Sequence, residues 1–224
     1  MSVAKLARQQ GATRLCHFTP ARNFAQMLTS GHIEGTAELT AQGAAFKQND
    51  ERRHDGGLSE VCCSLEYPNT WYLDKARVRD PHFLDWLILT IDLAVLDLPG
   101  VGFFPYNASR GHGSARKTGV DGFMGMFAQT VHGQQTRSRL RAHPAWWPTD
   151  DQAEIQVPGP ISISLVQAVI YRTDQQRLTE VARHAMLRPL HPLPPAIVAP
   201  TLFDKHALSA SVRRGERPAE RPIP

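Results

Sequence analysis

Trp86-Leu-Ile-Leu-Thr-Ile-Asp92 is the stretch that decides the fold. It is apolar nearly throughout, as a β-strand buried on both faces of a sheet should be. Further strands are predicted on both sides of it, at 14–18, 61–65, 153–157 and 161–171. Strands therefore dominate, above all in the second half of the chain.

A helix is predicted over 21–30, because Phe24, Met27 and Leu28 would share one of its faces. Gly31 follows directly and can adopt the left-handed conformation that ends many helices. Two more short helices are expected at 39–47 and 123–130. Together with the strands, these helices indicate an α+β fold.

The length and composition suit one soluble globular domain. The chain has 224 residues, of which 42% are hydrophobic and 21% charged. We expect a single domain over 1–206 and a disordered tail over 207–224, because the tail is rich in Pro and Arg and nearly free of aromatic residues. No apolar stretch is long enough to cross a membrane, and no secretory signal is expected at the N-terminus.

The cysteines and histidines argue against disulfides and metal. Three cysteines, two of them adjacent, make a poor disulfide framework and favour a cytoplasmic location. No Cys or His pair has the spacing of metal ligands, so no metal is expected. Cys62 or Cys63 could act as a nucleophile with His17 as its base. A buried structural role for these thiols is the more ordinary interpretation.

A basic interval lies between Pro105 and Trp147. It contains six Lys/Arg residues and one acid, Asp121, in a chain whose net charge is +4. This charge indicates a polyanionic partner, although a solvated basic loop is an equally good explanation. Binding of nucleic acid requires cations for the phosphates and aromatic rings for the bases. We therefore expect the nucleic-acid-binding residues to be Arg137, Arg139, Arg141, Trp146 and Trp147. For one of the two tryptophans, simple core packing is as good an interpretation.

Three polar segments are candidates for chemistry. Residues 149–157 bring acids and amides into an apolar strand, where alternation places Glu154 and Gln156 on one face. Residues 15–19 carry a His and a Thr on one face of a strand. Residues 49–55 are a cluster of charged and polar residues before the next predicted strand. Taken singly, each segment could also be a solvated edge, a satisfied core histidine or an exposed loop.

Four motifs in order resemble the DarT-type DNA ADP-ribosyltransferases, toxins that transfer ADP-ribose from NAD⁺ to a base of single-stranded DNA. The motifs span about residues 14–175 and are His17-Phe-Thr-x-x-x-Asn23, Glu51-Arg52-Arg53, Phe103-Phe104-Pro-x-Asn107-Ala108 and Gln152-Ala153-Glu154-Ile155-x-Val157. The resemblance implies an ADP-ribosyltransferase-like fold, in which mixed and antiparallel sheets form an NAD⁺-binding cleft flanked by helices. It also implies an antitoxin partner.

The resemblance assigns roles to individual residues. It implies that Glu154 and Arg53 are catalytic, with Arg52 as the neighbouring alternative for the arginine. It further implies that His17, Thr19, Asn23 and Arg53 bind NAD⁺. Residues 59–73 depart from the thymidine-modifying branch, which leaves the modified base open and is compatible with guanine or with an RNA target.

The chemistry of the reaction explains why it needs such residues. Loss of nicotinamide leaves positive charge on the ribose, which a fixed carboxylate stabilises where water does not screen it. The same carboxylate can take a proton from the attacking base. An arginine can pair with the diphosphate or polarise the acceptor. The alternatives are an enzyme acting on RNA, a catalytically silent nucleic-acid-binding module, and a protein-modifying transferase.

Overall fold

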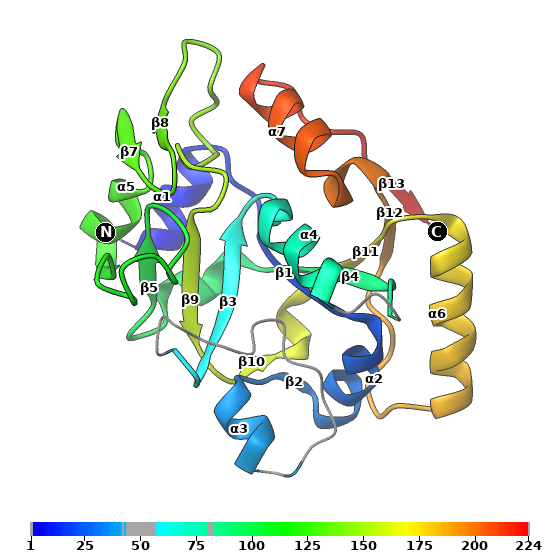
Figure 1. Cartoon of the computed structure of the whole chain (residues 1–224). Helices are drawn as coiled ribbons and strands as arrows, with labels where there is room; N and C mark the ends of the chain where they lie inside the picture. Colours follow the sequence, from blue (N-terminus) through cyan, green and yellow to red (C-terminus); the bar gives the residue numbers. More distant parts are fainter. Residues whose placement is uncertain (1, 42, 44–56, 80–82, 224) are drawn as a thin grey trace.

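The computed structural model describes residues 2–41, 43, 57–79 and 83–223. Its main sheet is made of β1 (Leu15–Pro20), β3 (Glu60–Leu65), β4 (Trp86–Ile91), β5 (Gly102–Phe104), β6 (Lys117–Thr118), β9 (Glu154–Pro158), β11 (Val166–Tyr171), β12 (Ala196–Val198) and β13 (Arg221–Ile223). Within the described residues these strands lie in the order β13-β12-β11-β4-β1-β3-β9-β5-β6 (Figure 1). Every neighbouring pair is antiparallel except β11 and β12.

Two small ladders lie beside this sheet. They pair β2 (His32–Ile33) with β10 (Ile161–Ser162), and β7 (Thr130–His132) with β8 (Thr136–Ser138). The helices are α1 (Val3–Gln9), α2 (Ala21–Ser30), α3 (Thr36–Ala41), α4 (Thr70–Arg79), α5 (Gly119–Gly125), α6 (Asp174–Leu187) and α7 (Lys205–Arg213). Short 3₁₀ turns cover Leu93–Asp97, Ile163–Leu165 and Pro200–Phe203.

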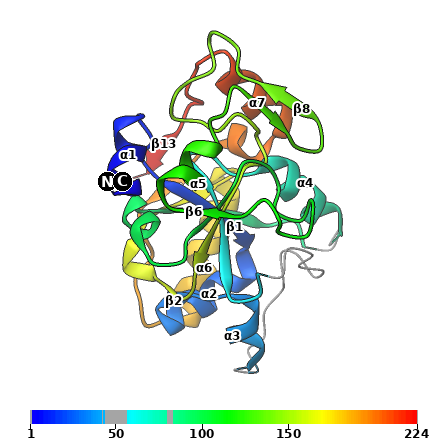
Figure 2. The ribbon, with the colours of Figure 1, turned by 90° about the vertical axis from the view of Figure 1, so that its left-hand side faces the viewer.

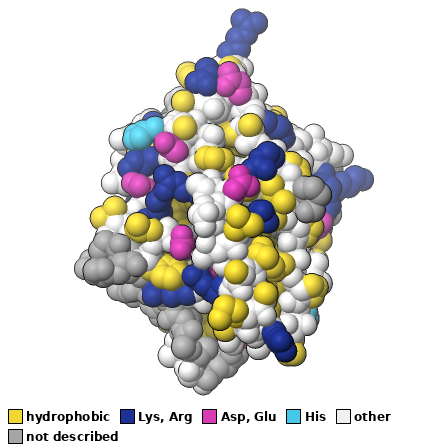
Figure 3. Space-filling view, turned by 90° about the vertical axis from the view of Figure 1, so that its right-hand side faces the viewer, with side chains coloured by type: hydrophobic (Ala, Val, Ile, Leu, Met, Phe, Trp, Pro, Cys, Tyr) yellow, Lys and Arg dark blue, Asp and Glu magenta, His cyan; other side chains and the backbone are white. Residues whose placement is uncertain are grey.

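The helices divide between the two faces of the sheet. The larger buried cluster joins the sheet to α1, α2 and α5, and the smaller cluster joins it to α4 and α7. The β7–β8 hairpin and α7 lie at one end of the molecule, and α3 lies at the other (Figures 1 and 2). Helix α6 leaves apolar side chains exposed, and the face that carries it mixes hydrophobic and basic side chains (Figure 3).

The strongest local patterns are confirmed. Every residue of β4 is buried, and β4 pairs on both sides, with β1 and β11. Helix α2 has the predicted bounds, and Gly31 ends it with a φ of 78° and an N–H bonded to the Met27 carbonyl. Such a φ favours glycine because it has no Cβ.

Other predicted boundaries are wrong. The helix expected at 123–130 lies at Gly119–Gly125, and the chain then enters β7. The strand expected at 161–171 is interrupted by the 3₁₀ turn between β10 and β11. Helix α3 begins earlier than the helix expected at 39–47, most of which lies outside the described residues.

The C-terminal segment also differs from its expected disorder. The composition of 207–224 predicted no structure, whereas α7 and β13 are formed there. Leu208 and Val212, four positions apart on α7, are buried in the smaller cluster. Two arginines of the segment, Arg213 and Arg217, form ion pairs with the buried carboxylates of Asp151 and Glu66. The arginines therefore hold the segment on the sheet. Among the described helices, none combines the length and apolar character needed to cross a bilayer.

Candidate active site

The main sheet is nearly divided in two between β1 and β3. Strand β1 pairs with β4 along its whole length, but with β3 only through Leu15 and Cys16. Strand β3 then uses its other edge to pair with β9 from Glu60 to Cys63. The two half-sheets consequently part directly after Cys16, at the position of His17.

His17 bridges this junction. Its Nδ1 lies 2.8 Å from the carbonyl oxygen of Cys62 on β3. Because a carbonyl only accepts, Nδ1 carries the proton, and Nε2 is the acceptor of the neutral ring. Burial lowers the pKa of His17, and the bond to Cys62 offsets part of that effect. The ring is therefore neutral at pH 7 and suits hydrogen bonding better than proton uptake.

Two further predicted NAD⁺-binding residues lie close to His17. Thr19 is on the same face of β1, and its Oγ1 accepts a hydrogen bond of 3.3 Å from Nδ2 of Asn23, in the first turn of α2. Thr19 is 1% exposed and Asn23 is 7% exposed. The structure thus brings His17, Thr19 and Asn23 together where the strand passes into the helix.

Glu154 is held at the start of β9. Its Oε2 accepts a 3.3 Å hydrogen bond from the backbone N–H of Ala108, and its Oε1 accepts a 3.1 Å bond from Nε2 of Gln156. The neighbours Ile155 and Val157 are fully buried on the opposite face, as the alternation predicted. Two donors, one on β9 and one in the turn after β5, fix the direction of this half-buried carboxylate.

A chain of contacts joins Glu154 to His17. Gln156, which donates to Glu154, is the register partner of Cys62, whose carbonyl binds His17. Strand β3 alone separates β9 from β1, so Glu154 and His17 lie on strands about 10 Å apart. Arg53, the predicted catalytic partner, lies outside the described residues together with Arg52.

A pocket of about 330 Å³ is lined by chain neighbours of Glu154 and of Ala108, its hydrogen-bond donor, although not by Glu154 itself. Asn107 and Ser109, which flank Ala108, line it, and so does Gln152, two residues before Glu154. The rest of its wall is aromatic or charged except for the neutral amide of Gln134: Trp71, Tyr72, Lys75, Arg110 and Asp150. Burial raises the pKa of Asp150. The volume falls in the range of small-ligand sites.

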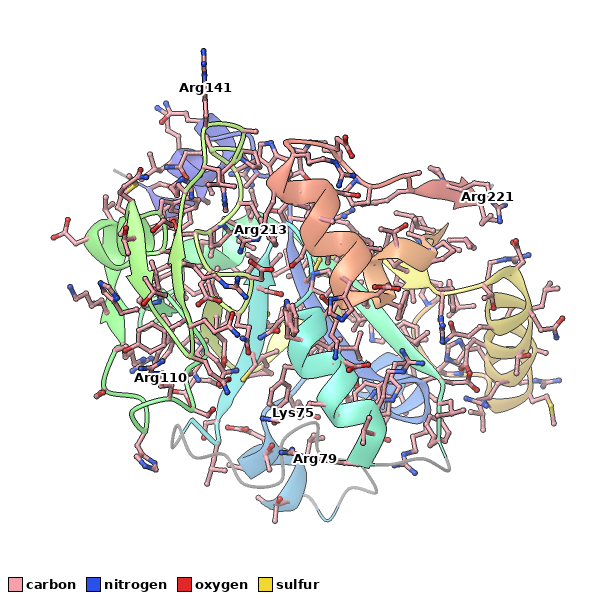
Figure 4. All side chains as sticks on the ribbon, turned by 45° about the horizontal axis from the view of Figure 1, so that its top comes forward. Lys75, Arg79, Arg110, Arg141, Arg213 and Arg221 are labelled. Atoms are coloured by element: carbon pink, nitrogen blue, oxygen red, sulfur yellow. The ribbon has the colours of Figure 1, made fainter. Side chains whose placement is uncertain are left out.

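The three arginines predicted to bind nucleic acid do not share one face. Arg137 is half-buried on β8, and Arg141 projects into solvent (Figure 4). Arg139 turns inward and donates to the carbonyl oxygens of Pro144 and Trp147. These alternate residues would face one way in an extended strand, but the chain leaves β8 after Ser138 and turns.

The two tryptophans also pack against protein. Trp147 is 3% exposed, stacks on His143 with ring centroids 5.6 Å apart, and belongs to the smaller core cluster. Trp146 is half-buried under the guanidinium of Arg217. The structure therefore gives Trp147 the core role that the sequence left open for one of the pair.

The thiols of Cys16 and Cys63 are buried. Burial raises the pKa of Cys16 to about 12 and also raises that of Cys63. Neither is a ready thiolate at neutral pH. Within the described residues, no group of three His, Cys, Asp or Glu side chains is arranged to hold a metal ion.

Sequence reasoning missed the pocket residues on α4. Trp71, Tyr72 and Lys75 fall in or beside the segment that departs from the thymidine-modifying pattern, and no helix was expected there. The adjacent Trp-Tyr pair followed by a lysine was an available signal. It became informative only when the fold placed α4 opposite Arg110.

Comparison with known proteins supports the resemblance. The family model described as ssDNA thymidine ADP-ribosyltransferase, DarT, matches residues 16–203. None of the curated proteins matches this chain in sequence.

Solved structures share its fold. Thermus sp. 2.9 DarT in complex with NAD⁺ aligns with a TM-score of 0.57 at 11% identity, covering 86% of this chain and 98% of that one. The same protein in complex with ADP-ribosylated ssDNA gives 0.58 at 11% identity, covering 87% and 97%. Thermosipho africanus DarTG in complex with ADP-ribose gives 0.56 at 13% identity. The match covers 85% of this chain and about half, 51%, of the Thermosipho chain.

Proposed function

Because this chain belongs to the DarT family of ssDNA thymidine ADP-ribosyltransferases, we propose that Glu154 is the carboxylate that directs transfer of ADP-ribose from NAD⁺ to a base of single-stranded DNA. The observation that carries the proposal is the orientation of Glu154 by Ala108 and Gln156, beside a pocket with aromatic and cationic walls. Family membership makes the chain an NAD⁺-dependent ADP-ribosyltransferase.

NAD⁺ binds at the junction of the half-sheets in this proposal. Nε2 of neutral His17 accepts a hydrogen bond from a ribose hydroxyl or from the nicotinamide amide. Thr19 and Asn23 complete that polar surface. Arg53 pairs with the diphosphate or polarises the acceptor base, as the family resemblance implies. The Thermus structure with NAD⁺ has the same fold and supports this placement.

The reaction breaks the bond between the ribose C1′ and the nicotinamide nitrogen. Nicotinamide leaves as a neutral molecule, and C1′ acquires the positive charge. Glu154 stabilises that charge, because a fixed carboxylate is worth most in a site that excludes water. The acceptor atom of the base then bonds to C1′, and its proton passes to Glu154.

We propose that the acceptor base enters the pocket between α4 and Arg110. Trp71 and Tyr72 offer aromatic surface for stacking, and Lys75 and Arg110 can meet the flanking phosphates. These residues replace Arg139 and Trp147 in the predicted nucleic-acid interface, while Arg137 and Arg141 remain candidates for more distant phosphates. A base reaches such a pocket only when it is unpaired.

Base choice is proposed to depend on the same pocket. Residues 59–73, which depart from the thymidine-modifying pattern, include the pocket residues Trp71 and Tyr72. Different side chains in the pocket wall would form hydrogen bonds with different base edges, and so select a different base. Single-stranded oligonucleotides that differ in one base, offered with labelled NAD⁺, identify the base directly.

The central experiment presents labelled NAD⁺ with single-stranded DNA, with RNA and with a protein mixture. Label on DNA alone, lost in Glu154→Gln, supports the proposal. Label on RNA alone would identify an RNA-modifying enzyme, and label on protein alone would identify a protein-modifying transferase. Transfer to none of them by the wild-type chain contradicts the proposal and leaves the silent binding module.

Toxicity and location complete the proposal. A DNA-modifying activity implies a toxin that needs an antitoxin to remove or block the modification, and it implies action in the cytoplasm. The similarity in fold to the Thermosipho africanus DarTG structure supports a toxin–antitoxin setting. Three free cysteines are compatible with a reducing compartment. Unimpaired growth of cells that express active wild-type protein alone would contradict toxicity.

A further inference from the structure

The segment that leads into Glu154 is tied to the C-terminal helix. Asp151, three residues before Glu154, has a side chain that is only 6% exposed. It forms an ion pair with Arg213 and accepts a hydrogen bond from Ser209, both on α7. Nε1 of Trp71 lies 3.4 Å from the same carboxylate. One buried acid thus joins α7, α4 and the approach to β9.

This arrangement determines what faces the acceptor pocket. Asp150 and Gln152 line the pocket, whereas Asp151 between them points away from it, toward α7. Figure 4 shows Arg213 on the inner side of α7, where that helix faces the loop before β9. Holding Asp151 on α7 therefore fixes the direction of its two neighbours.

Helix α7 is itself firmly anchored. Leu208 and Val212 are buried with Leu73 of α4 in the smaller core cluster. Lys205 forms a 2.6 Å ion pair with Asp74 of α4. The helix can therefore transmit a fixed position to Asp151 rather than follow its movements.

The family match ends at residue 203, and α7 begins at Lys205. We propose that α7 is a positioning element for the acceptor pocket of this chain, and that it acts through the Arg213–Asp151 ion pair. This inference rests on the proposed function for the meaning of the pocket, but not for the mechanical link. Arg213 and Asp151 are positioning residues, because both act on the acceptor through Asp150, Gln152 and Trp71.

The physical reason is the cost of an unpaired buried charge. Without Arg213, the Asp151 carboxylate would remain in an environment where its charge is poorly solvated. The loop would move to bring it to water, and Asp150 and Gln152 would move with it. A displacement of about 1 Å in a substrate-positioning group can lower activity by about 100-fold.

The test compares Arg213→Ala with two matched variants of the full chain. Arg213→Lys keeps the positive charge, so its exchange rate and activity should lie between those of Arg213→Ala and wild type. Arg214→Ala removes the adjacent arginine, which is exposed and pairs with Glu216 at 2.8 Å. Each protein is measured for amide hydrogen exchange over 149–154 and for steady-state transfer from NAD⁺ to a single-stranded oligonucleotide.

We expect Arg213→Ala to accelerate exchange over 149–154 and to lower kcat/KM for the oligonucleotide by about 10- to 100-fold. The KM for NAD⁺ should stay near the wild-type value, and Arg214→Ala should match wild type throughout. Unchanged exchange in Arg213→Ala would overturn the inference. An equal decrease in kcat/KM for the oligonucleotide and for NAD⁺ would also overturn it, because that result would mean general unfolding.

The two proposals fail differently. Faster local exchange in Arg213→Ala, together with an inactive wild-type enzyme, would support the mechanical link and contradict the proposed function. Normal wild-type transfer with unaffected Arg213→Ala kinetics would leave the proposed function intact and remove the role of α7.

Discussion

Nε2 of Gln156 lies 3.1 Å from Oε1 of Glu154, and the two side chains project from the same face of β9. The amide has no charge to contribute, so its effect on the carboxylate is one of direction. Gln156 is 2% exposed and cannot easily turn away. In the proposed mechanism this bond aims the carboxylate at the ribose carbon that nicotinamide leaves.

Replacing the carboxylate should remove activity and preserve the fold. We expect Glu154→Gln to lower kcat by at least about 100-fold, because the developing positive charge loses its fixed partner. Glu154 is half-buried at the first position of β9, so the unfolding temperature should change little. Asp121→Asn, which changes an exposed acid on α5, is the control and should keep wild-type activity. Retained transfer in Glu154→Gln would exclude the assigned role.

Removing the amide that orients Glu154 should have a smaller effect. A hydrogen bond to a charged group is worth about 1.5–3 kcal/mol, so Gln156→Met should lower kcat by roughly 10- to 100-fold. The methionine keeps a similar length and apolar contact in the buried site. The KM for NAD⁺ should stay close to wild type. A change confined to that KM would place Gln156 in substrate binding instead.

The cations of the acceptor pocket should control binding to the phosphates of DNA. Lys75→Ala and Arg110→Ala should each weaken oligonucleotide binding and reduce the slope of log K against log salt by about 0.7. Lys5→Ala, an exposed cation on α1, tests whether any lost positive charge has this effect. Equal slopes for the Lys5 and Lys75 variants would contradict a specific phosphate contact.

Buried histidines should make the protein sensitive to acid. Burial lowers the pKa of His17, His143 and His184 from the ordinary value of 6.5. Below pH 6.5 these histidines bind protons in the unfolded chain but remain neutral in the folded protein until the pH reaches their lower pKa values. Stability is therefore complete above that pH and decreases as pH falls toward the folded pKa values. Each histidine should contribute a slope of about 1.4 kcal/mol per pH unit in that window.

His184→Phe tests this directly by denaturant unfolding at several pH values. The His184 ring packs edge-on against Phe24, with centroids 5.1 Å apart, so an aromatic replacement suits the site. It should make the free energy of unfolding fall less steeply as the pH drops below 6.5, by at most the one proton that a single histidine can bind. The raised pKa of the neighbouring Glu180 has the opposite sign and acts nearer its ordinary value of 4.5.

Much of the framework was predictable because its signals are local. The apolar run of β4, the one-sided helix α2 with its glycine end, and the alternation around Glu154 all depend on neighbours within one turn or strand. The four motifs also indicated the family that the model match over 16–203 confirms. The predicted NAD⁺-binding residues Thr19 and Asn23 could be placed together because they lie four positions apart.

The sequence by itself therefore determined the core strands, the face on which Glu154 projects, and the family. Only the tertiary structure decided that Trp147 is core, that Arg139 holds a loop, and that the C-terminal residues form α7 and β13. Arg139 bonds to carbonyl groups five and eight residues away, which only the turn after β8 brings into reach. The order of the C-terminal residues depends on partners far away along the chain, such as Asp151 and Arg213, which are 62 residues apart. Composition records the charge of a segment but not whether folding brings a buried opposite charge to meet it. That pairing orders the arginine-rich end.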